Sequence, residues 1–493
     1  MNLTALLVIP LLTALTILLL RRHHLVKWTA LIGSIIQCLL CFVLVAAFRK
    51  EQITSPSDFM YFIQQFDWLP AWNISYKLGV DGISIAMIML TAFVVLAGVL
   101  VSWNIEKMTR EFYFLLILLS LGAHGFFLSL DLFMQFFFLE IAVIPKYLLI
   151  GIWGSGKKEY SANKLALMLM GGSALVLVGI LALYFSSPDK TFDIVRLSEI
   201  HFSTRTQRIF FPFLFVGFGI FTALFPFHTW VPDGHSSAPT AGSMFLAGIS
   251  MKLGSYGCLR VATFLMPEAA RQYSPTIIVL SCIAILYGAF ATMMQKDLKY
   301  MNAYSSISHC GFILLGIGML TRTAIIGSVM QMVSHGLMTA LFFAVIGMIY
   351  DRTHTRMINE MGGLMKMMPM ISTAFFIAGL CSLGLPGLSG FAAEITVFIG
   401  SWQRTGLFYR TATIIACMSI VVTAVYILRA ISQTLMGPLK NPAFGNIKDA
   451  NWNERLAAVV LIAGIVLIGM APYWLSELVR GGADIIAGRL MSK

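Results

Sequence analysis

Charged residues are scarce in this chain of 493 residues. They make up 11% of the sequence, whereas hydrophobic residues make up 58%. Soluble chains carry about 25% charged residues, so a water-soluble fold of this length would lack the polar surface that it needs. The hydrophobic residues also come in runs of about 20, the length that crosses a bilayer as one helix. The composition therefore excludes a soluble globular protein and predicts an all-α polytopic membrane protein.

Cysteine is also scarce, and its placement excludes most cofactor chemistry. All seven Cys fall inside apolar runs, where Cys behaves as a small hydrophobic residue. Cys38 and Cys41 form a CxxC in mid-helix with no second pair, so we expect neither a metal site nor a redox site. The sequence also has no nucleotide, haem or iron–sulfur motif. We therefore expect this chain to bind no cofactor and no metal.

The basic charge balance of the chain, +12, does not indicate a nucleic-acid partner. The Lys and Arg residues lie mainly in loops between the apolar runs, where they suit the anionic headgroups of a lipid bilayer. Aromatic residues do not interleave with them in a basic patch. We therefore expect the lipid bilayer as the partner of these charges and exclude nucleic-acid binding.

Apolar runs occupy most of the chain and predict membrane spans. The first run lacks the basic start and the small-residue cleavage site of a signal peptide, so we predict a spanning helix there. Basic residues gather in alternate loops, which places those loops in the cytoplasm and both termini outside. The predicted spans, about fourteen in number, are 2–20, 26–48, 82–104, 111–129, 131–153, 164–185, 209–230, 240–265, 274–295, 300–319, 322–350, 369–405, 411–435 and 455–478.

Two of these spans are interrupted by proline and glycine. Pro226 falls in the seventh span, and Pro386 lies in Gly384-Leu-Pro-Gly-Leu-Ser-Gly390 in the middle of the twelfth. Proline removes a backbone donor and glycine relaxes the chain, so we expect a helix break at each. Breaks that lie five spans apart have opposite orientations in the membrane. This arrangement is typical of an inverted repeat with sites beside the breaks.

An inverted repeat divides the chain into four predicted parts. Residues 1–110 hold the first spans, 111–265 a first repeat of five helices, 266–435 a second repeat of five helices, and 436–493 a loop and the last span. The stretches between spans are too short for a soluble domain, although 186–208 has room for a short surface helix.

Three ionisable residues lie deep in predicted spans. Glu140 is in span five, Lys252 in span eight and Glu394 just after the break of span twelve. An ionised group at the bilayer centre costs about 2.5–3.5 kcal/mol on insertion scales, and such residues are functional by default. A structural ion pair between helices is the alternative. We favour a site that carries protons across the membrane.

Two histidines follow in the second half of the chain. His309 lies in span ten and His335 in span eleven. Histidine titrates near neutral pH, so it suits a proton relay, although either residue alone would be typical of a hydrogen-bonded core histidine. Their presence beside Lys252 and Glu394 favours the relay. Ser305 and its serine neighbours would hold ordered water there.

Two further groups allow more than one interpretation. His228, Asp233 and His235 flank the break of span seven with a spacing that resembles a metal site. They lie near a membrane surface among prolines, so we expect a supporting role and no metal. Lys146 follows Glu140 by six residues, which places it about 120° around the helix and about 9 Å along it. It can approach Glu140 or extend towards the inner surface, and both alternatives stay open.

These residues occur in motifs that extend over almost the whole chain. The motifs are Val80-Asp-Gly-Ile-Ser84, His228-Thr-Trp-Val-Pro-Asp-Gly-His235 with Ala238-Pro-Thr-Ala-Gly-Ser243, Lys296-Asp-Leu-Lys299 with Ala303-Tyr-Ser-Ser-Ile-Ser-His309, and His354-Thr-Arg356 with Met361-Gly-Gly-Leu364. With them the chain resembles the M-type antiporter-like subunits of proton-pumping NADH:quinone oxidoreductase, respiratory complex I. The last motif resembles these subunits more than their L- and N-type relatives. Multisubunit sodium/proton antiporters share the wider motif set.

The resemblance implies a subunit with two inverted five-helix repeats, broken at helices seven and twelve, in a bacterial inner membrane. It implies proton translocation beside L- and N-type subunits, with NADH, FMN, Fe–S clusters and quinone bound by other subunits. Glu140, Lys252 and Glu394 match the family's Glu on helix five, Lys on helix eight and Glu on helix twelve. His309 and His335 match its relay histidines.

One position departs from the family pattern. The family's Lys on helix seven is replaced here by Phe221, so Glu140 lacks its expected partner. Either Lys146 supplies the missing charge or the first half of the subunit does not conduct. Two alternatives to a proton pump therefore stay open. They are a subunit of a cation/proton antiporter and a non-pumping membrane scaffold.

Overall fold

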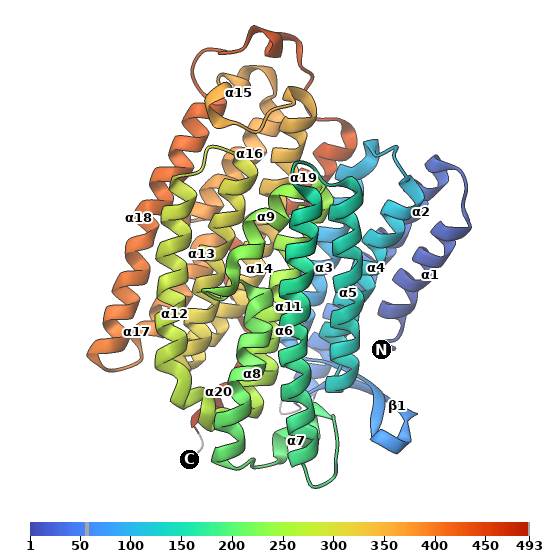
Figure 1. Cartoon of the computed structure of the whole chain (residues 1–493), viewed down its shortest axis with the longest axis vertical. Helices are drawn as coiled ribbons and strands as arrows, with labels where there is room; N and C mark the ends of the chain where they lie inside the picture. The colour runs from blue at the N-terminus through green and yellow to red at the C-terminus, as the bar shows by residue number, and fades with distance from the viewer. Residues whose placement is uncertain (55–58, 492–493) are drawn as a thin grey trace.

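The structure is a computed structural model that describes residues 1–54 and 59–491. Long helices run side by side through the molecule, and a β-hairpin lies at one end (Figure 1). The helices of the first half are α1 (Ala5–Leu19), α2 (His23–Thr54), α3 (Gly82–Val101), α4 (Thr109–Leu128), α5 (Leu132–Trp153), α6 (Lys158–Ser186), α7 (Ile194–Glu199), α8 (Thr204–Thr222), α9 (Trp230–Ser237), α10 (Thr240–Phe245) and α11 (Met251–Gly257). Those of the second half are α12 (Pro267–Met293), α13 (Leu298–Met319), α14 (Arg322–Thr353), α15 (Leu364–Met367), α16 (Pro369–Leu383), α17 (Ser389–Trp402), α18 (Leu407–Leu435), α19 (Trp452–Met470) and α20 (Pro472–Met491).

The helices confirm the predicted all-α membrane fold. Within the described residues, ten helical stretches are long and apolar enough to cross a membrane, and one of them is the combined stretch Thr204–Ser237. Other predicted spans are shorter or interrupted, such as α1 and the pair α16 and α17. The count of about fourteen spans therefore stays a prediction, as do the four predicted parts of the chain.

The basic loops gather at one end of the molecule. The connections after α1, α3, α5 and α12 lie towards the upper end of Figure 1, whereas both termini lie towards the lower end. This arrangement agrees with the alternation of basic loops in the sequence. Which end faces the cytoplasm stays a prediction.

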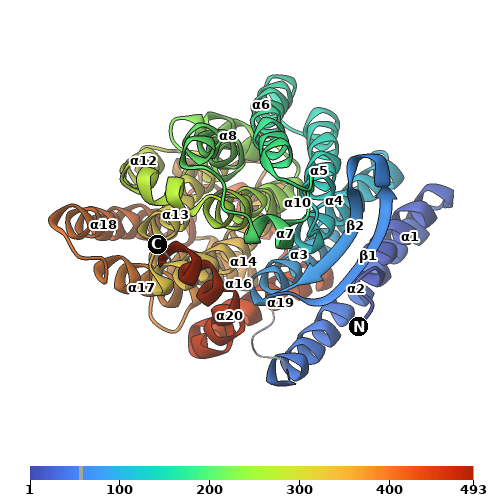
Figure 2. The same ribbon diagram turned by 90° about the horizontal axis from the view of Figure 1, so that it is seen from below.

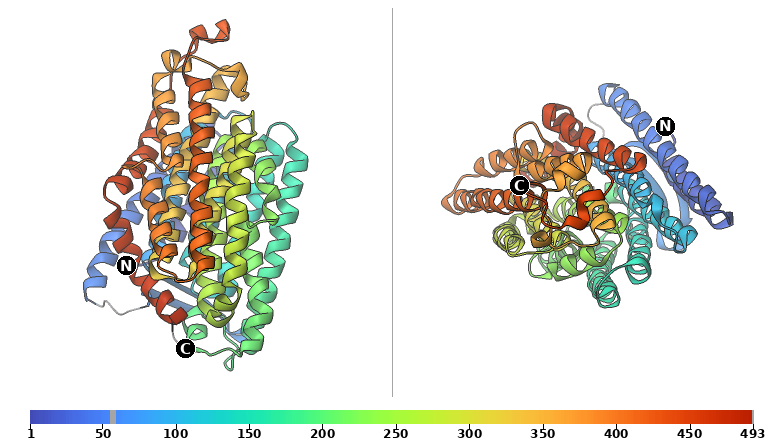
Figure 3. Two further views of the ribbon diagram at one scale, coloured as in Figure 1. Left: turned by 90° about the vertical axis from the view of Figure 1, so that its left-hand side faces the viewer. Right: turned by 90° about the horizontal axis from the view of Figure 1, so that it is seen from above.

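The C-terminal part differs from the prediction. The last predicted span, 455–478, is two helices, because α19 ends at Met470 and α20 begins at Pro472. Proline has no N–H to continue a helical hydrogen-bond ladder. Figure 3 shows the deep red C-terminal helix slanting along the side of the bundle towards its lower end. There α20 packs against α3 and α14.

A β-hairpin occupies part of the polar stretch before α3, where the sequence predicted no element. β1 (Tyr61–Leu69) pairs antiparallel with β2 (Ile74–Val80), from Tyr61 opposite Val80 to Leu69 opposite Ile74. β2 is mostly buried, whereas the second half of β1 is exposed. Figure 2 shows the two strands lying across the lower end of α3 and α4.

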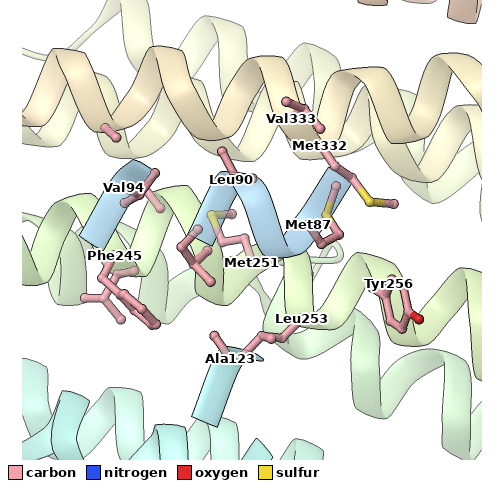
Figure 4. Packing of buried hydrophobic residues seen from close by; sticks show 14 of the residues in the cluster. Met87, Leu90, Val94, Ala123, Phe245, Met251, Leu253, Tyr256, Met332 and Val333 are labelled. Atoms are coloured by element: carbon pink, nitrogen blue, oxygen red, sulfur yellow. The ribbon is translucent and has the colours of Figure 1, made fainter. Parts of the chain in front are cut away.

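The long helix α14 forms the centre of the bundle. Its most apolar stretch is entirely buried, and it packs against α3, α10, α13, α16, α17 and α19. In Figure 4, Met87, Leu90 and Val94 of α3 lie between Met332 and Val333 of α14 and the segment that contains α10 and α11. A helix that is apolar all round is expected only where other helices surround it. Polar side chains in this stretch of α14 therefore point into protein and not into lipid.

A buried ion pair joins α3 to the helix that follows α11. Asp81 caps α3 by accepting from Ser84 N at 2.9 Å, and its other oxygen accepts from Arg260 Nη2. Arg260 and Asp81 are 1% and 3% exposed. Arg260 lies in a π-helical turn, Cys258–Thr263, with the Phe59, Tyr256 and Phe264 rings around its guanidinium. The pair fixes the lower end of α3 against the first half of the bundle.

We expect Asp81→Asn to destabilise the protein by about 3–5 kcal/mol, because the change leaves the Arg260 charge buried without its partner. The matched control is Asp484→Asn, which removes an ion pair with Arg322 whose side chains are 43% and 42% exposed. That change should cost less than about 1 kcal/mol. Thermal unfolding of the detergent-solubilised variants measures both effects. Equal melting temperatures for the two variants would contradict the expectation.

Candidate functional site

Both predicted helix breaks are present in the structure. After α8, Ala223 adopts a left-handed backbone (φ +71°), and the chain continues through Pro226 and a short turn into α9. After α16, Gly384 (φ +76°) and Gly387 (φ +92°) lead past Pro386 into α17. Irregular backbone at membrane depth is tolerated where protein or water satisfies its polar groups. The two breaks therefore mark positions inside the protein where polar groups gather.

Lys252 is the most enclosed charged group of the site. It lies on α11 directly after a π-helical turn, Leu246–Ser250, and it is fully buried. Such turns leave carbonyls free, and Ala247 O accepts from Lys252 Nζ at 2.6 Å. Nζ also lies 2.7 Å from His335 Nδ1. A charged Lys has only donors, so His335 accepts at Nδ1 and carries its own proton on Nε2.

Two glycines let α14 approach the helix of Lys252. Gly336 follows His335, and Gly248 lies in the π-helical turn. A Cβ on Gly336 would lie 2.9 Å from Gly248 O, and a Cβ on Gly248 would lie 3.3 Å from Gly336 O. A larger residue at either position would push the two backbones apart. The glycine pair therefore sets the separation between Lys252 and His335.

A row of buried groups continues from His335 to Glu394. The ring centres of His335 and His309 are 5.4 Å apart. His309 Nδ1 lies 3.4 Å from Glu394 Oε1, and His309 Nε2 lies 3.0 Å from Ser382 Oγ. His309 and Glu394 are 3% and 5% exposed. The structure thus brings four of the predicted residues together from α11, α14, α13 and α17.

Ser305 lies on α13, one turn from His309, but its hydroxyl group has a partner in its own helix. Ser305 Oγ donates to Asn302 O at 2.8 Å. Ser308 Oγ likewise donates to a carbonyl, that of Ile285, at 2.9 Å. The predicted role of Ser305 in holding water therefore stays a prediction.

In the first half, Lys146 and Phe221 face each other. Lys146 is 1% exposed, and its Nζ lies 5.9 Å from the centre of the Phe221 ring. Glu140 is half-buried, and it is close enough to act electrostatically on Lys146. Within the described part of the chain, Lys146 Nζ and Glu140 Oε1 have no hydrogen-bond partner. Lys146 therefore extends into the bundle and not towards the membrane surface.

The three predicted supporting residues around α9 point to different neighbours. His228 stacks on Phe225, with ring centres 5.4 Å apart. Asp233 forms an ion pair with Lys164 at 2.7 Å. His235 is fully buried with ring contacts to Trp230 and Phe343. Over residues 1–54 and 59–491, no group of three or more His, Cys, Asp or Glu side chains is placed to hold a metal ion.

The sequence did not single out several polar groups that the structure places at or near the site. Gln331 Nε2 lies 3.3 Å from His309 Nδ1, and Ser382 Oγ lies 3.0 Å from Nε2 of the same ring. Lys299 is 5% exposed, and its Nζ donates to Ala238 O at 2.8 Å. His124 is fully buried on α4. His124 and Lys299 are ionisable and lie in apolar surroundings, so the sequence could have indicated them as functional candidates. Gln331 and Ser382 are not ionisable, and nothing in the sequence distinguishes them from other polar residues.

Comparison with known proteins places this geometry in a family. Residues 129–421 match the family model described as NADH:quinone oxidoreductase/Mrp antiporter, TM. The match includes every residue from Lys252 to Glu394, together with Glu140, Lys146 and Phe221. The chain belongs to this family.

Curated members of the family match almost the full chain. NAD(P)H-quinone oxidoreductase chain 4 2 of Microcystis aeruginosa is 36% identical over 460 residues, 92% of this chain and 82% of the relative. NAD(P)H-quinone oxidoreductase chain 4 of Gloeobacter violaceus is 34% identical over 488 residues, 98% of this chain and 92% of the relative. The resemblance inferred from the sequence motifs is confirmed.

Solved structures agree with the family assignment. A chain of respiratory complex I from Thermus thermophilus superposes with a TM-score of 0.91 at 25% identity, and the match covers 100% of both chains. A chain of the Mrp complex from Dietzia superposes with a TM-score of 0.80 at 18% identity, over 99% of both chains, and shares the fold.

We expect Gly384→Ala to disturb both the backbone and Glu394. An L-residue in the left-handed region costs about 1–2 kcal/mol, and the new Cβ would lie 2.8 Å from Glu394 Oε2. The melting temperature should fall, and the infrared carboxyl band that disappears in Glu394→Gln should shift. Gly488→Ala is the control, because it lies in α20 with nothing within 4 Å of its Cβ position. An unshifted carboxyl band in Gly384→Ala would show that the carboxyl group is not confined as described.

Proposed function

We propose that this chain is a proton-translocating membrane-arm subunit of an NADH:quinone oxidoreductase. The observation that carries the proposal is the buried row Lys252–His335–His309–Glu394, which reaches from the π-helical turn before Lys252 to the helix break at Gly384. The names of the curated relatives support the enzyme assignment. Electron transfer takes place in other subunits, which bind NADH, FMN, Fe–S clusters and quinone. The partners are the L- and N-type subunits of the membrane arm, and the location is a bacterial inner membrane.

The row supports a proton path with defined donors and acceptors. Lys252 Nζ gives a proton to His335 Nδ1 along the 2.7 Å hydrogen bond. His335 then releases its Nε2 proton towards His309 across the gap between the two rings, which a water or a ring rotation bridges. His309 passes a proton from Nδ1 to Glu394 Oε1. Glu394 then releases its proton on the exit side, and the proton on His335 returns from Nδ1 to Nε2 by ring rotation or exchange. Neutral Lys252 takes up a new proton from the opposite side, and these steps together restore the starting state.

Electrostatic interactions can couple electron transfer in other subunits to these proton-transfer steps. A nearby opposite charge stabilises the charged form of a group, and a like charge destabilises it. A positive charge that approaches Lys252 from a neighbouring subunit favours the transfer of the Lys252 proton to His335. An anionic Glu394 in turn attracts the proton to His309. A change of charge in a neighbouring subunit is therefore enough to move a proton along the row, and this chain performs no redox step.

In the first half, we propose that Lys146 replaces the Lys that the family carries at the position of Phe221. The support is geometric, because the Lys146 ammonium lies over the Phe221 ring and not at the membrane surface. A cation over an aromatic face is stabilised by about 0.5–2 kcal/mol, more when it is desolvated. Glu140 supplies the opposite charge. The first half would then keep its Glu–Lys couple with the Lys on α5 in place of α8.

We expect Lys252→Ala and Glu394→Gln to slow proton transfer through this chain by on the order of 10²-fold, the lower range of what a positioned proton-transfer group contributes. The number of protons that the complex moves per NADH should fall as a result. The measurement is proton uptake by inverted membrane vesicles per NADH oxidised. Lys366→Ala and Glu477→Gln are the matched controls, since both residues are outside the row and exposed. Wild-type stoichiometry in both test variants would refute the proposed path. Replacing Na⁺ by K⁺ in the buffer tests the cation/proton antiporter alternative.

We expect Lys146→Ala to lower the number of protons moved per NADH, because Glu140 then loses its only proposed partner. The double variant Lys146→Ala/Phe221→Lys should restore that number, since it returns the charge to the position that the family uses. Lys157→Ala, at an exposed site beyond the end of α5, is the control. If the stoichiometry is unchanged in Lys146→Ala, the replacement hypothesis is wrong and the first half does not conduct.

A further inference from the structure

An apolar cavity of about 710 Å³ lies outside the proton path. It lies between α2, α3, α14, α19 and α20, is partly open at the surface of the bundle, and its lining includes Phe42, Leu90, Leu337, Ala463 and Trp474. The described lining residues carry no charge and no hydroxyl group. The volume lies in the range of about 300–1,000 Å³ that is typical of ligand sites. Apart from the indole N–H of Trp474, the side chains of the wall are apolar and therefore suit a hydrocarbon chain better than water.

The part of the cavity that follows α19 has the length of one bilayer leaflet. Its lining follows α19 from Val460 to Ala471, which at 1.5 Å per residue is about 16 Å. Half of the hydrocarbon core of a bilayer is about 15 Å. On α3 the lining residues Ala86 and Met89 lie close to the start of the helix. The cavity therefore occupies the half of the bundle that lies nearer the β-hairpin.

Cationic groups stand at the end of the cavity that faces the membrane surface. The Arg49 guanidinium lies 5.5 Å from the centre of the Trp474 ring, which lines the cavity. Arg49 and Lys50 are exposed, and they outnumber Glu51, the acidic residue of the same turn. On α20, Glu477 is already paired with Arg480. Tryptophan and basic residues together are typical of the level of the lipid headgroups.

We propose that a phospholipid binds here as a resident ligand, with an acyl chain in the cavity and its phosphate at Arg49. A transmembrane helix is too large to be the occupant. A helix about 10 Å wide and about 16 Å long fills roughly 1,250 Å³, more than the cavity provides. A phospholipid matches the apolar wall, the length of one leaflet and the positive end at the same time.

The position of the cavity gives the lipid a role beside the proton path. Val333 and Leu337 line the cavity, and they lie on either side of His335 along α14. An acyl chain against these residues keeps water away from that flank of the helix. Protons can then leave Lys252 along the row but not sideways into the bilayer. The proposed lipid site can be tested independently of the proposed function, because lipid binding is measured without NADH oxidation or proton transport.

Photolabelling of native membranes tests the site. Membranes that contain the full complex with an affinity tag on this chain are illuminated with phosphatidylglycerol that carries a diazirine on its acyl chain. We expect labelled peptides from α3 and α19. Ala463→Phe fills the cavity and should lower this labelling about tenfold, which corresponds to 1.4 kcal/mol of binding free energy. Val459→Phe adds the same ring at a 51% exposed position of the same helix, and it should leave labelling unchanged.

Two further measurements distinguish the occupants. Arg49→Ala changes an exposed side chain, so the chain should fold normally while labelling falls. Excess unlabelled phosphatidylglycerol should compete with the probe, whereas decylubiquinone should not. Unchanged labelling in both Ala463→Phe and Arg49→Ala would overturn the proposal. Competition by decylubiquinone alone would overturn it as well, because the occupant would then be a quinone.

Discussion

The ammonium group of a lysine at bilayer depth needs partners that lipid does not provide, and the bundle is arranged to provide them to Lys252. The π-helical turn before Lys252 presents the Ala247 carbonyl, and α14 presents His335. His335 can lie at this depth because other helices surround α14. A polar group on a helix that faces lipid would be costly. The central position of α14 and the layers around it follow from this requirement.

The two halves of the bundle meet the same requirement in different ways. In the second half, hydrogen bonds and close contacts join Lys252 to Glu394 through two histidines. In the first half, the Lys146 ammonium lies over an aromatic ring and has Glu140 as its electrostatic partner. The two lysines therefore differ in their surroundings. Lys252 has two hydrogen-bond acceptors, whereas Lys146 has an aromatic ring and a nearby carboxylate.

The features that were predicted from the sequence are those with a strong local signal. Glu140, Lys252 and Glu394 were evident because each interrupts an apolar run, and the breaks at Pro226 and Gly384 followed from backbone chemistry. The break at Pro472 had the same signal and was missed, because the apolar run continues through it. The β-hairpin was missed because only one of its strands is largely buried.

Other features depend on tertiary contacts that no local pattern shows. Asp81 and Arg260 lie 179 residues apart, and neither has a sequence feature that points to the other. The π-helical turns Leu246–Ser250 and Cys258–Thr263 contain no proline or other local signal that distinguishes them from an α-helix. Gln331 and Ser382 became part of the site because His309 lies beside them in space. The direction of the Lys146 side chain also depends on packing. Its spacing from Glu140 allowed it to point towards Glu140 or towards the membrane surface.

The glycine pair at the crossing of α14 and the π-helical turn has a kinetic consequence. With no side chain at Gly248 or Gly336, the two backbones rest directly on each other, and protein interiors compress little. The crossing therefore acts as a fixed spacer that holds the proton donor and its acceptor at hydrogen-bond length while the surrounding charges change. Proton tunnelling and transfer rates fall steeply as such a distance grows. The donor–acceptor distance of the first step of the relay is thus determined by two residues that have no side chain.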